Sequence, residues 1–396
     1  MDHPVSICAS GCICAAGNDT STCFETMLNG AVKPSFAADF YFDQPMRSPV
    51  FAVPKEWLYK GIHTPALTTT MQLLFQAVDE ALTQSEITPQ KLSGLKVGAC
   101  IGSSTGASLN FLSFYKQWRE DKKPYLESIE SYLNCNPATA LAERYDLNGP
   151  VQTVTNACSS GTDAIGIGAS WIRQDLCDLV IAGGADALSD ISYTGFSRLM
   201  ITSPERCRPF DSCRLGLNLG EGAAVLILAS DKAIRELGLN SIAQVMGYGT
   251  CCDAYHLTAP HPEGPMLKQA INEALDRSGI SADQIGFVNV HGTGTENNDR
   301  IESQVISEIF PGTPFTGIKG FTGHTLGAAG AIEAVMTIIS LQNGLLMPTS
   351  GFRKTAVGST ISPITKCTKI TAEYALSDSL AFGGNNSALV FKKESA

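Results

Sequence analysis

Residues 154–164 hold one cysteine, Cys158, between small residues, where a β-branched run gives way to helical spacing. The pattern predicts a strand, a tight turn and a helix, with the thiol on the turn. At the start of a helix, the helix dipole and unpaired backbone N–H groups favour the thiolate, which is the nucleophilic form of cysteine. The small neighbours Ser159, Ser160 and Gly161 leave room for a substrate, which favours a nucleophile over an inert buried cysteine.

Two of the six histidines stand in Gly-rich turns that follow apolar runs. His291 begins the stretch His-Gly-Thr-Gly-Thr, and His324 lies in Thr-Gly-His-Thr-Leu-Gly. Because open α/β sheets place ligands at strand ends, we expect both histidines to lie near Cys158. Two imidazole N–H groups could stabilise an oxyanion or enolate, or one histidine could act as general base. Lys319 could orient His324 if it is buried beside a carboxylate such as Glu333; the alternative is a surface lysine.

The elements that must position these residues show as apolar runs alternating with stretches of helical spacing. The expected strands are Val97–Gly102, Leu179–Gly183, Ala223–Ala229, Phe287–Val290 and Ser387–Phe391. The expected helices are Met71–Leu82, Ser160–Arg173, Met266–Ser278 and Ala328–Gln342. This alternation predicts a layered α/β protein with largely buried sheets.

The chain has one soft boundary, near residues 236–241, where a charged helix ends and a new strand begins. We predict an N-terminal half over residues 1–238 that carries the nucleophile, and a C-terminal half over residues 239–396 that carries both histidines. Residues 109–134 are more polar and aromatic, and we expect a helical excursion from the layers there.

Composition excludes several classes of protein. The net charge of −10, with no basic run, argues against a nucleic-acid partner. The N-terminus lacks a signal peptide and no apolar stretch is expected to reach membrane-spanning length, so we expect a cytoplasmic protein without a membrane contact. The 13 scattered cysteines indicate reduced thiols. Cys12-Ile13-Cys14 and Cys251-Cys252 lack further ligands at zinc spacing, so we expect no metal site.

The three turns, in this order, resemble those of the β-ketoacyl-[acyl-carrier-protein] synthases, in the branch whose site is Cys-His-His. The resemblance extends over nearly the whole chain. It includes Arg208-Pro209-Phe210-Asp211, the stretch Asp253 to Pro260, and Phe382-Gly383-Gly384-Asn385-Asn386. It implies the thiolase-like fold, with two similar α/β halves stacked as five layers αβαβα. It also implies a homodimer, or a heterodimer with a related subunit, whose two-fold axis lies near the strand that leads to Cys158.

The resemblance implies a mechanism for the three turns. Cys158 accepts an acyl chain from the phosphopantetheine thioester of an acyl carrier protein, with the backbone N–H groups of Cys158 and Phe382 as oxyanion hole. His291 and His324 assist the decarboxylation of a malonyl thioester, and the carbanion attacks the acyl group. The product is a 3-oxoacyl chain two carbons longer, and no cofactor is needed beyond the carrier's arm.

Further residues match family positions. By resemblance, Lys319 and Glu333 organise the site, Asp299 and Glu302 support it, and Thr293 and Thr295 contact the pantetheine arm. Thr105 matches a position that lines the acyl pocket, and a polar residue there argues against a preference for long saturated chains. In the gating loop, Ala381 replaces a glycine of the family and removes easy access to positive φ.

Four other functions compete with this interpretation. A non-catalytic subunit that determines chain length in a heterodimer would keep the fold but lose the nucleophile, whereas this chain keeps Cys158, His291 and His324. A thiolase or a coenzyme A-primed enzyme needs Asn or a second Cys at these turns. A cysteine hydrolase would not need two histidines on separate turns, and a pure binding module would not need reactive side chains in Gly-rich turns.

Overall fold

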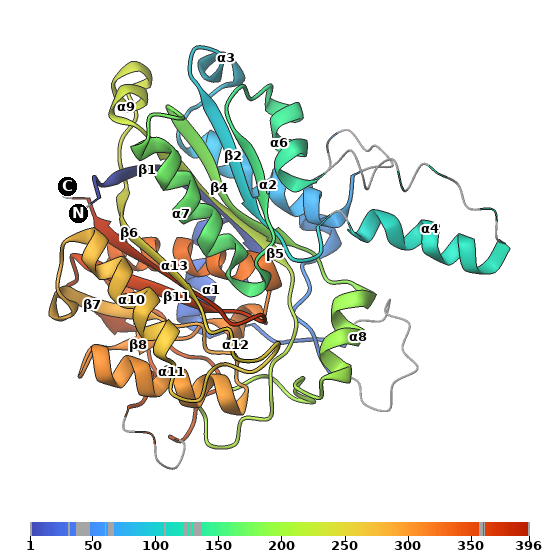
Figure 1. The fold of residues 1–396 in the computed structure, drawn as a ribbon, viewed down its shortest axis with the longest axis vertical. Helices are drawn as coiled ribbons and strands as arrows, with labels where there is room; N and C mark the ends of the chain where they lie inside the picture. Colours follow the sequence, from blue (N-terminus) through green and yellow to red (C-terminus); the bar gives the residue numbers. More distant parts are fainter. Residues whose placement is uncertain are drawn as a thin grey trace.

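The computed structural model describes residues 2–30, 32–36, 48–59, 61, 67–106, 108–121, 123, 126, 129, 136–355, 359 and 361–394. Figure 1 shows helices on both sides of a strongly twisted central sheet. Ten strands form this sheet: β1 (Val5–Cys14), β2 (Val97–Gly102), β3 (Val151–Val154), β4 (Leu179–Asp186), β5 (Gly222–Ala229), β6 (Ala243–Cys252), β7 (Ile285–Asn289), β8 (Phe315–Thr316), β11 (Tyr374–Leu380) and β12 (Asn385–Lys393). A separate small sheet pairs β9 (Leu345–Leu346) with β10 (Thr368–Lys369).

The strand order reveals two halves of the same topology. The sheet runs β3-β2-β4-β5-β1 and continues as β6-β12-β11-β7-β8. In the first half, β2 pairs in parallel with β3 and β4, and β5 pairs antiparallel with β4 and β1. In the second half, β7 pairs in parallel with β8 and β11, and β12 pairs antiparallel with β11 and β6. A short antiparallel pairing of β1 with β6 joins the halves.

The helices complete the layers. They are α1 (Thr20–Asn29), α2 (Thr69–Gln84), α3 (Pro89–Leu92), α4 (Ser108–Asp121), α6 (Pro137–Tyr145), α7 (Ser160–Arg173), α8 (Asp190–Arg198), α9 (Asp231–Leu237), α10 (Pro265–Ser278), α11 (Glu296–Ile309), α12 (Lys319–Thr322) and α13 (Ala329–Asn343). Four 3-10 turns are η1 (Lys55–Trp57), η2 (Ala157–Ser159), η3 (Ala282–Gln284) and η4 (Leu326–Ala328). Helices α2 and α6 cover one outer face, α10 and α11 the other, and α7 and α13 lie between the halves. The chain therefore has the five-layer thiolase-like fold.

Small residues allow the two central helices to approach closely. A Cβ atom on Gly330 of α13 would lie 1.9 Å from Thr162 Oγ1 of α7, and one on Gly161 would lie 2.8 Å from the Gly327 carbonyl oxygen. Neither position admits a side chain without separating the helices. This close approach brings the N-terminal ends of α7 and α13, and the turns before them, to one point.

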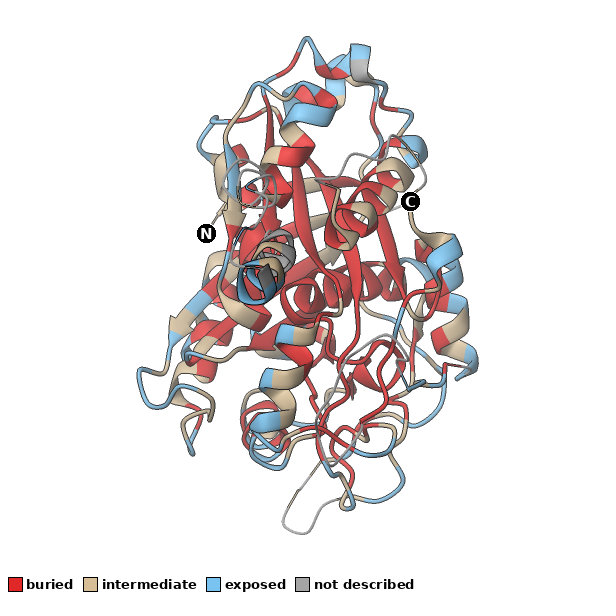
Figure 2. Cartoon of the chain, turned by 90° about the vertical axis from the view of Figure 1, so that its right-hand side faces the viewer, coloured by how far each residue is buried: buried red, intermediate tan, exposed pale blue. Residues whose placement is uncertain are grey.

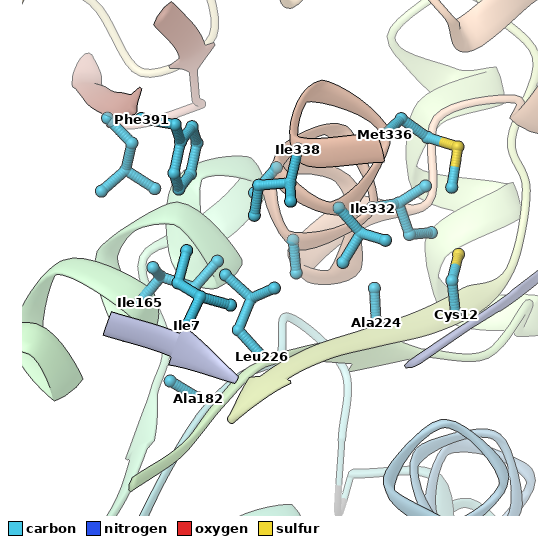
Figure 3. Packing of buried hydrophobic residues seen from close by; sticks show 14 of the residues in the cluster. Ile7, Cys12, Ile165, Ala182, Ala224, Leu226, Ile332, Met336, Ile338 and Phe391 are labelled. Atoms are coloured by element: carbon cyan, nitrogen blue, oxygen red, sulfur yellow. The ribbon is translucent and has the colours of Figure 1, made fainter. Parts of the chain in front are cut away.

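The core is divided by the sheet. Figure 2 shows the buried residues gathered in the strands and the central helices. The central cluster, part of which is drawn in Figure 3, packs α13 residues such as Ile332 and Ile338 onto Leu226 of β5 and Phe391 of β12. Two further clusters lie under the outer helices of each half. Strands buried on both faces explain why their sequences read as continuous apolar runs.

All nine predicted strands and helices named above are confirmed, with boundaries that differ by at most a few residues. The helical excursion is confirmed over α4, which projects from the layered body in Figure 1. Most of the predicted stretch from residue 122 to 134 lies outside the described residues.

One expectation about membranes was wrong. Leu326–Asn343, which spans η4 and α13, is by length and composition apolar enough to cross a membrane. However, 83% of this segment is buried inside the protein, so its hydrophobicity reflects its place between the two sheets.

Candidate active site

Cys158 lies on the turn between β3 and α7, as the sequence predicted. It is the middle residue of η2 and is 4% exposed. Ala157 has a φ of 50°, an uncommon conformation for a residue with a side chain. Ser160 stabilises this turn, because its hydroxyl donates to the Ala157 carbonyl at 2.6 Å and accepts from the Asn156 N–H at 2.8 Å. The strained turn presents the thiol at the end of the sheet.

The expectation that Cys158 favours the thiolate was wrong for the unliganded site. Burial raises the pKa of the Cys158 thiol to about 11, and only partial compensation comes from the Lys319 charge and the Phe382 backbone N–H. In this enclosed position, the free-energy cost of removing the charged thiolate from water is larger than its stabilisation by the helix dipole and the backbone N–H groups. The resting nucleophile is therefore a thiol that must lose its proton during the reaction.

The structure brings both histidines to Cys158. His291 follows β7, His324 follows α12, and both are almost completely buried. The Cys158 sulfur and one ring nitrogen of each histidine lie within 4.8 Å of one another. The two imidazole rings meet edge to face, with centroids 5.2 Å apart. Cys158 and His291 follow strand ends, where open α/β sheets gather ligands, whereas His324 was predicted to follow a strand but comes after the short helix α12.

Hydrogen bonds assign the tautomer of each imidazole. The Leu326 backbone N–H donates to Nδ1 of His324 at 3.1 Å, and Lys319 Nζ lies 3.0 Å from Nδ1 of His291. Because both Nδ1 atoms face donors, the ring proton of each neutral histidine is assigned to Nε2. Burial, followed by the Lys319 charge, holds the pKa of both histidines well below 6.5, so they are neutral at physiological pH.

Lys319 is buried, so the surface alternative is wrong. Its Nζ contacts Glu333 Oε1 and donates to the His291 carbonyl oxygen at 2.6 Å. Burial raises the pKa of Glu333 to about 7, against the opposing effect of Lys319. The three ammonium donors thus have three acceptors, Glu333 and two atoms of His291. Lys319 therefore orients His291. The expectation that it orients His324, its neighbour in the sequence, was wrong.

Two of the acidic residues of α11, Glu302 and Asp299, hold the turn that carries His291. Glu302 accepts the backbone N–H of His291 at 2.5 Å and that of Gly292 at 2.9 Å. Asp299 accepts the N–H groups of Thr293 and Gly294, each at 3.1 Å. Burial raises the pKa of both carboxyls, with the neighbouring Asp378 as a further cause for Glu302. They shape the backbone of the turn and do not line the cavity.

A cavity of about 530 Å³ opens onto the reactive groups. Its described lining includes Cys158, His291, His324, Thr293, Thr295 and Phe382. The Phe382 ring stacks on Phe196 of α8 at a centroid distance of 5.3 Å, and the Phe382 backbone N–H lowers the pKa of the Cys158 thiol against the larger effect of burial. Positive φ in the following loop falls on Gly383 and Gly384 and not on Ala381, which keeps an ordinary backbone conformation.

Thr105 lies apart from this cavity lining. Its hydroxyl donates to Asp186 at 3.0 Å, and Asp186 also accepts the backbone N–H groups of Ser104, Thr105 and Gly106. The polar group of Thr105 is thus directed into the protein, and its role in choosing the acyl chain stays a prediction.

Comparisons with known proteins decide the family. The N-terminal domain model of the β-ketoacyl synthases matches residues 2–233, and the C-terminal domain model matches residues 242–353. The chain belongs to the β-ketoacyl synthase family. It is 32% identical over 344 residues to 3-oxoacyl-[acyl-carrier-protein] synthase 2 of Staphylococcus aureus, covering 81% of each chain.

Two other similarities extend over the full length. Nodulation protein E of Rhizobium meliloti is 29% identical over 407 residues, covering 99% of this synthase and 100% of the relative. A solved ketosynthase in complex with its chain length factor, from Xenorhabdus doucetiae, matches with a TM-score of 0.85 and 29% identity over 99% of this synthase and 98% of that chain. The synthase is an acyltransferase with a condensing function in fatty-acid or polyketide synthesis.

Three further residues build the synthase site and were not predicted from the sequence. Asp186 joins the halves, because it accepts the Gly327 N–H of η4 at 2.7 Å in addition to the loop after β2. Asp163, in the first turn of α7, accepts from Asn156 and Ser159 beside the nucleophile. Phe196 stacks on the cavity wall. An aspartate at the end of the buried run Leu179–Asp186 was a signal that a polar network lies there.

Proposed function

We propose that this synthase catalyses a decarboxylative Claisen condensation between an acyl chain held on Cys158 and malonyl-[acyl-carrier protein], giving a 3-oxoacyl-[acyl-carrier protein] two carbons longer. The observation that carries the proposal is the convergence of one thiol and two neutral imidazoles in a buried cavity, with both Nε2–H groups left to donate. A hydrolase needs one imidazole that accepts a proton; two donors fit an anionic oxygen instead.

The first half-reaction transfers the acyl group. The Cys158 sulfur attacks the thioester carbonyl of the acyl-carrier protein, the bond to the pantetheine sulfur breaks, and the proton of Cys158 ends on the departing pantetheine thiol. The backbone N–H groups of Cys158 and Phe382 stabilise the tetrahedral oxyanion. Phe382 and Cys158 both line the cavity, and the Phe382 N–H lowers the pKa of the thiol against the effect of burial, so this N–H is within reach of that position.

The second half-reaction forms the carbon–carbon bond. Malonyl thioester loses CO₂, and the electron pair of the broken bond forms an enolate whose oxygen accepts from Nε2–H of His291 and His324. The enolate carbon then attacks the acyl-Cys158 carbonyl, and the Cys158 thiolate leaves and takes up a proton. Neutral imidazoles suit this step, because they donate without protonating the carbanion, as an imidazolium would. Thr293 and Thr295, whose hydroxyls lie 2.9 Å apart at the cavity wall, contact the pantetheine arm.

The partners we propose are an acyl carrier protein and a second subunit, either a copy of this chain or a related chain length factor. The curated relatives are named for the carrier protein, and one similar solved structure pairs a ketosynthase with a chain length factor. Strand β3, which leads to Cys158, ends the sheet with Val151 and Gln152 exposed. An unpaired edge with an exposed valine is a surface that a second subunit would cover. The chemistry needs no cofactor beyond the phosphopantetheine arm.

Intact-mass analysis after incubation with a panel of acyl-carrier proteins tests the proposal. We expect wild type to gain the mass of one acyl group and Cys158→Ala to gain none. Cys100→Ala, which removes another fully buried thiol on β2, is the matched control and should acylate like wild type. Acylated wild type should then release CO₂ from malonyl-[acyl-carrier protein] and form the 3-oxoacyl product.

Failure of every primer to acylate wild type would contradict the proposal and favour the non-catalytic subunit. Hydrolysis of the acyl thioester without CO₂ release would instead favour a cysteine hydrolase. Co-purification with a related subunit distinguishes a missing partner from a missing activity, because a heterodimer should restore acylation at Cys158.

A further inference from the structure

Three cysteines outside the condensation site lie together beneath the turn that joins β1 to α1. Cys12 and Cys14 alternate along β1 and so point to the same face of the strand. Cys23 comes from the first turn of α1, which folds back over that face. All three side chains are completely buried. The spacing Cys-x-Cys-x₈-Cys is no zinc pattern, and only the fold brings Cys23 to the pair.

The three sulfur atoms have the spacing of ligands to one metal ion. All lie within 4.8 Å of one another, and the sulfurs of Cys14 and Cys23 are 3.6 Å apart. Metal–thiolate bonds of about 2.3 Å place two sulfurs on one ion about 3.7 to 4.0 Å apart. Small side-chain rotations would therefore bring the three sulfurs onto a common ion, with no movement of the strand.

Hydrogen bonds of the turn after β1 fix the positions of these cysteines. The Cys23 thiol donates to the Gly17 carbonyl oxygen at 3.3 Å. The Gly17 N–H in turn donates to the Cys14 carbonyl oxygen at 3.1 Å. The fold therefore holds the three sulfurs close together before an ion binds.

The surroundings favour a soft cation over a hard one. Figure 3 shows Cys12 in the apolar central cluster, with its sulfur directed toward that of Met336 on α13. The nearby Glu80 has both carboxylate oxygens engaged, one by the Cys12 N–H and one by the Thr20 N–H, each at 2.8 Å. Three thiolates with no oxygen ligand form a soft ligand set, which favours Cu(I). A structural zinc ion would need a fourth ligand in addition to the three sulfurs.

We propose that Cys12, Cys14 and Cys23 bind one Cu(I) ion in three-coordinate, sulfur-only geometry. On binding, three Cu–S bonds form and the S–H protons leave to solvent, with no change in the oxidation state of the copper. Ala15, Asn18 and Asp19, in the turn between β1 and α1, are partly exposed, and the proposal takes this turn as the route of entry. Because the ligands belong to β1 and α1, the ion would tie these elements together and stabilise the N-terminal half.

Anaerobic copper competition tests the proposal. Reduced protein is mixed with Cu(I) buffered by excess bicinchoninate, and copper per chain is measured after gel filtration, together with the X-ray absorption spectrum of the bound ion. We expect one copper per chain with sulfur-only ligation and a higher melting temperature. Cys14→Ala should weaken retention at least about 100-fold.

Two variants control for other thiols. Cys8 is also a buried cysteine of β1, but the bulge between Ile7 and Ala9 turns it into the cluster under α2, so Cys8→Ala should retain copper. Cys158→Ala removes the sulfur of the condensation site and should retain copper as well.

Several outcomes would overturn the proposal. These are no copper retained by wild type, retention lost equally in Cys8→Ala, a spectrum with nitrogen or oxygen ligands, or a Cys14–Cys23 disulfide in place of bound metal. If Cys14→Ala does not fold, the copper count and spectrum of wild type and Cys158→Ala still decide the question.

Discussion

The two strand-to-helix turns that meet at the active site are built alike and carry different chemistry. In the N-terminal half, β3 leads through η2 into α7; in the C-terminal half, β8 leads through α12 and η4 into α13. Each 3-10 turn begins with a residue of positive φ, 50° at Ala157 and 54° at Leu326. The middle residue of one turn is Cys158 and that of the other is Gly327. The same backbone turn thus carries a nucleophilic side chain in one half and a glycine, which has no side chain, in the other.

The difference shows that two turns of the same backbone shape have different roles in the site. Gly327 leaves space for the loop after β2, and its N–H is bound by Asp186, so this turn serves as a support. The reactive group beside this turn, His324, stands three residues earlier, where its Nδ1 accepts the Leu326 N–H. One turn supplies the nucleophile and the other positions a donor opposite it.

Besides the carboxylates of Glu302 and Asp299, two buried groups of opposite charge support the site, one from each half. In the N-terminal half the carboxylate of Asp186 gathers backbone N–H groups and hydroxyls, all neutral. In the C-terminal half the Lys319 ammonium lies among His291 and the Glu333 carboxylate. The first arrangement holds geometry, whereas the second also fixes the tautomer of His291, whose pKa is lowered by burial and then by the Lys319 charge.

Lys319→Met should have the largest effect, because it leaves Glu333 buried without its cation. Removing one partner of a buried ion pair costs about 3 to 5 kcal/mol of unfolding free energy. We also expect decarboxylation of malonyl-[acyl-carrier protein] to slow about 10- to 100-fold, since His291 loses its orienting donor. Urea denaturation and CO₂ release measure the two effects. The exposed Lys366→Met is the control, and a loss below about 1 kcal/mol at position 319 would contradict the ion-pair argument.

Gly327→Ala should destabilise the protein by about 1 to 3 kcal/mol. Its Cβ would lie 2.7 Å from the Ser104 nitrogen and 2.8 Å from Asp186 Oδ2, so the junction between the halves must open. Gly195→Ala in α8 meets no atom within 4 Å and serves as the control, expected to be neutral or stabilising. Thermal unfolding distinguishes them. Equal melting temperatures for the two variants would show that the turns are not in close contact.

The pH dependence of decarboxylation should reflect neutral histidines. Because the pKa of His291 and His324 is held well below 6.5, the rate should stay level as pH falls to 6.5 and decline only below it. Stability follows the same sign: unfolded histidines take up protons below pH 6.5 before folded ones do, so unfolding free energy falls there. Rates measured from about pH 5 to 8 test this. An acid limb at or above pH 6.5 would contradict the assigned protonation state.

Val151→Lys should have the smallest effect on the folded chain, within about 0.5 kcal/mol, because the residue is exposed on the edge strand β3. The corresponding edge of the other half is covered, since the Phe315 carbonyl of β8 accepts the Ile364 N–H at 3.0 Å. We expect the lysine to weaken subunit association in sedimentation velocity. Leu176→Lys, at another exposed apolar residue, should leave association unchanged. Equal effects of both would place the interface elsewhere.

Much of the local structure follows from the sequence. Residues 160–173 carry helical spacing that needs no partner to recognise, and the apolar run 97–102 reads as a strand because both of its faces are buried. The turns at Cys158, His291 and His324 are marked by small residues, since a turn beside a cavity has no room for large ones. These signals were enough to place Cys158 and His291 at strand ends and to indicate the fold class, whereas α12 separates His324 from β8.

The tertiary structure decided what depends on contacts between distant segments. Burial makes Cys158 a thiol in the resting site, because the local dipoles cannot replace lost water. Packing places Lys319 beside His291 and not His324. A buried ammonium needs hydrogen-bond acceptors, and the tertiary structure decides which acceptors lie near it. The same holds for Cys23, which reaches Cys12 and Cys14 only when α1 folds over β1. Sequence patterns indicate which residues suit a strand, a helix or a turn. The charge states of buried groups and the contacts between distant residues are set only when the helices pack against the sheet.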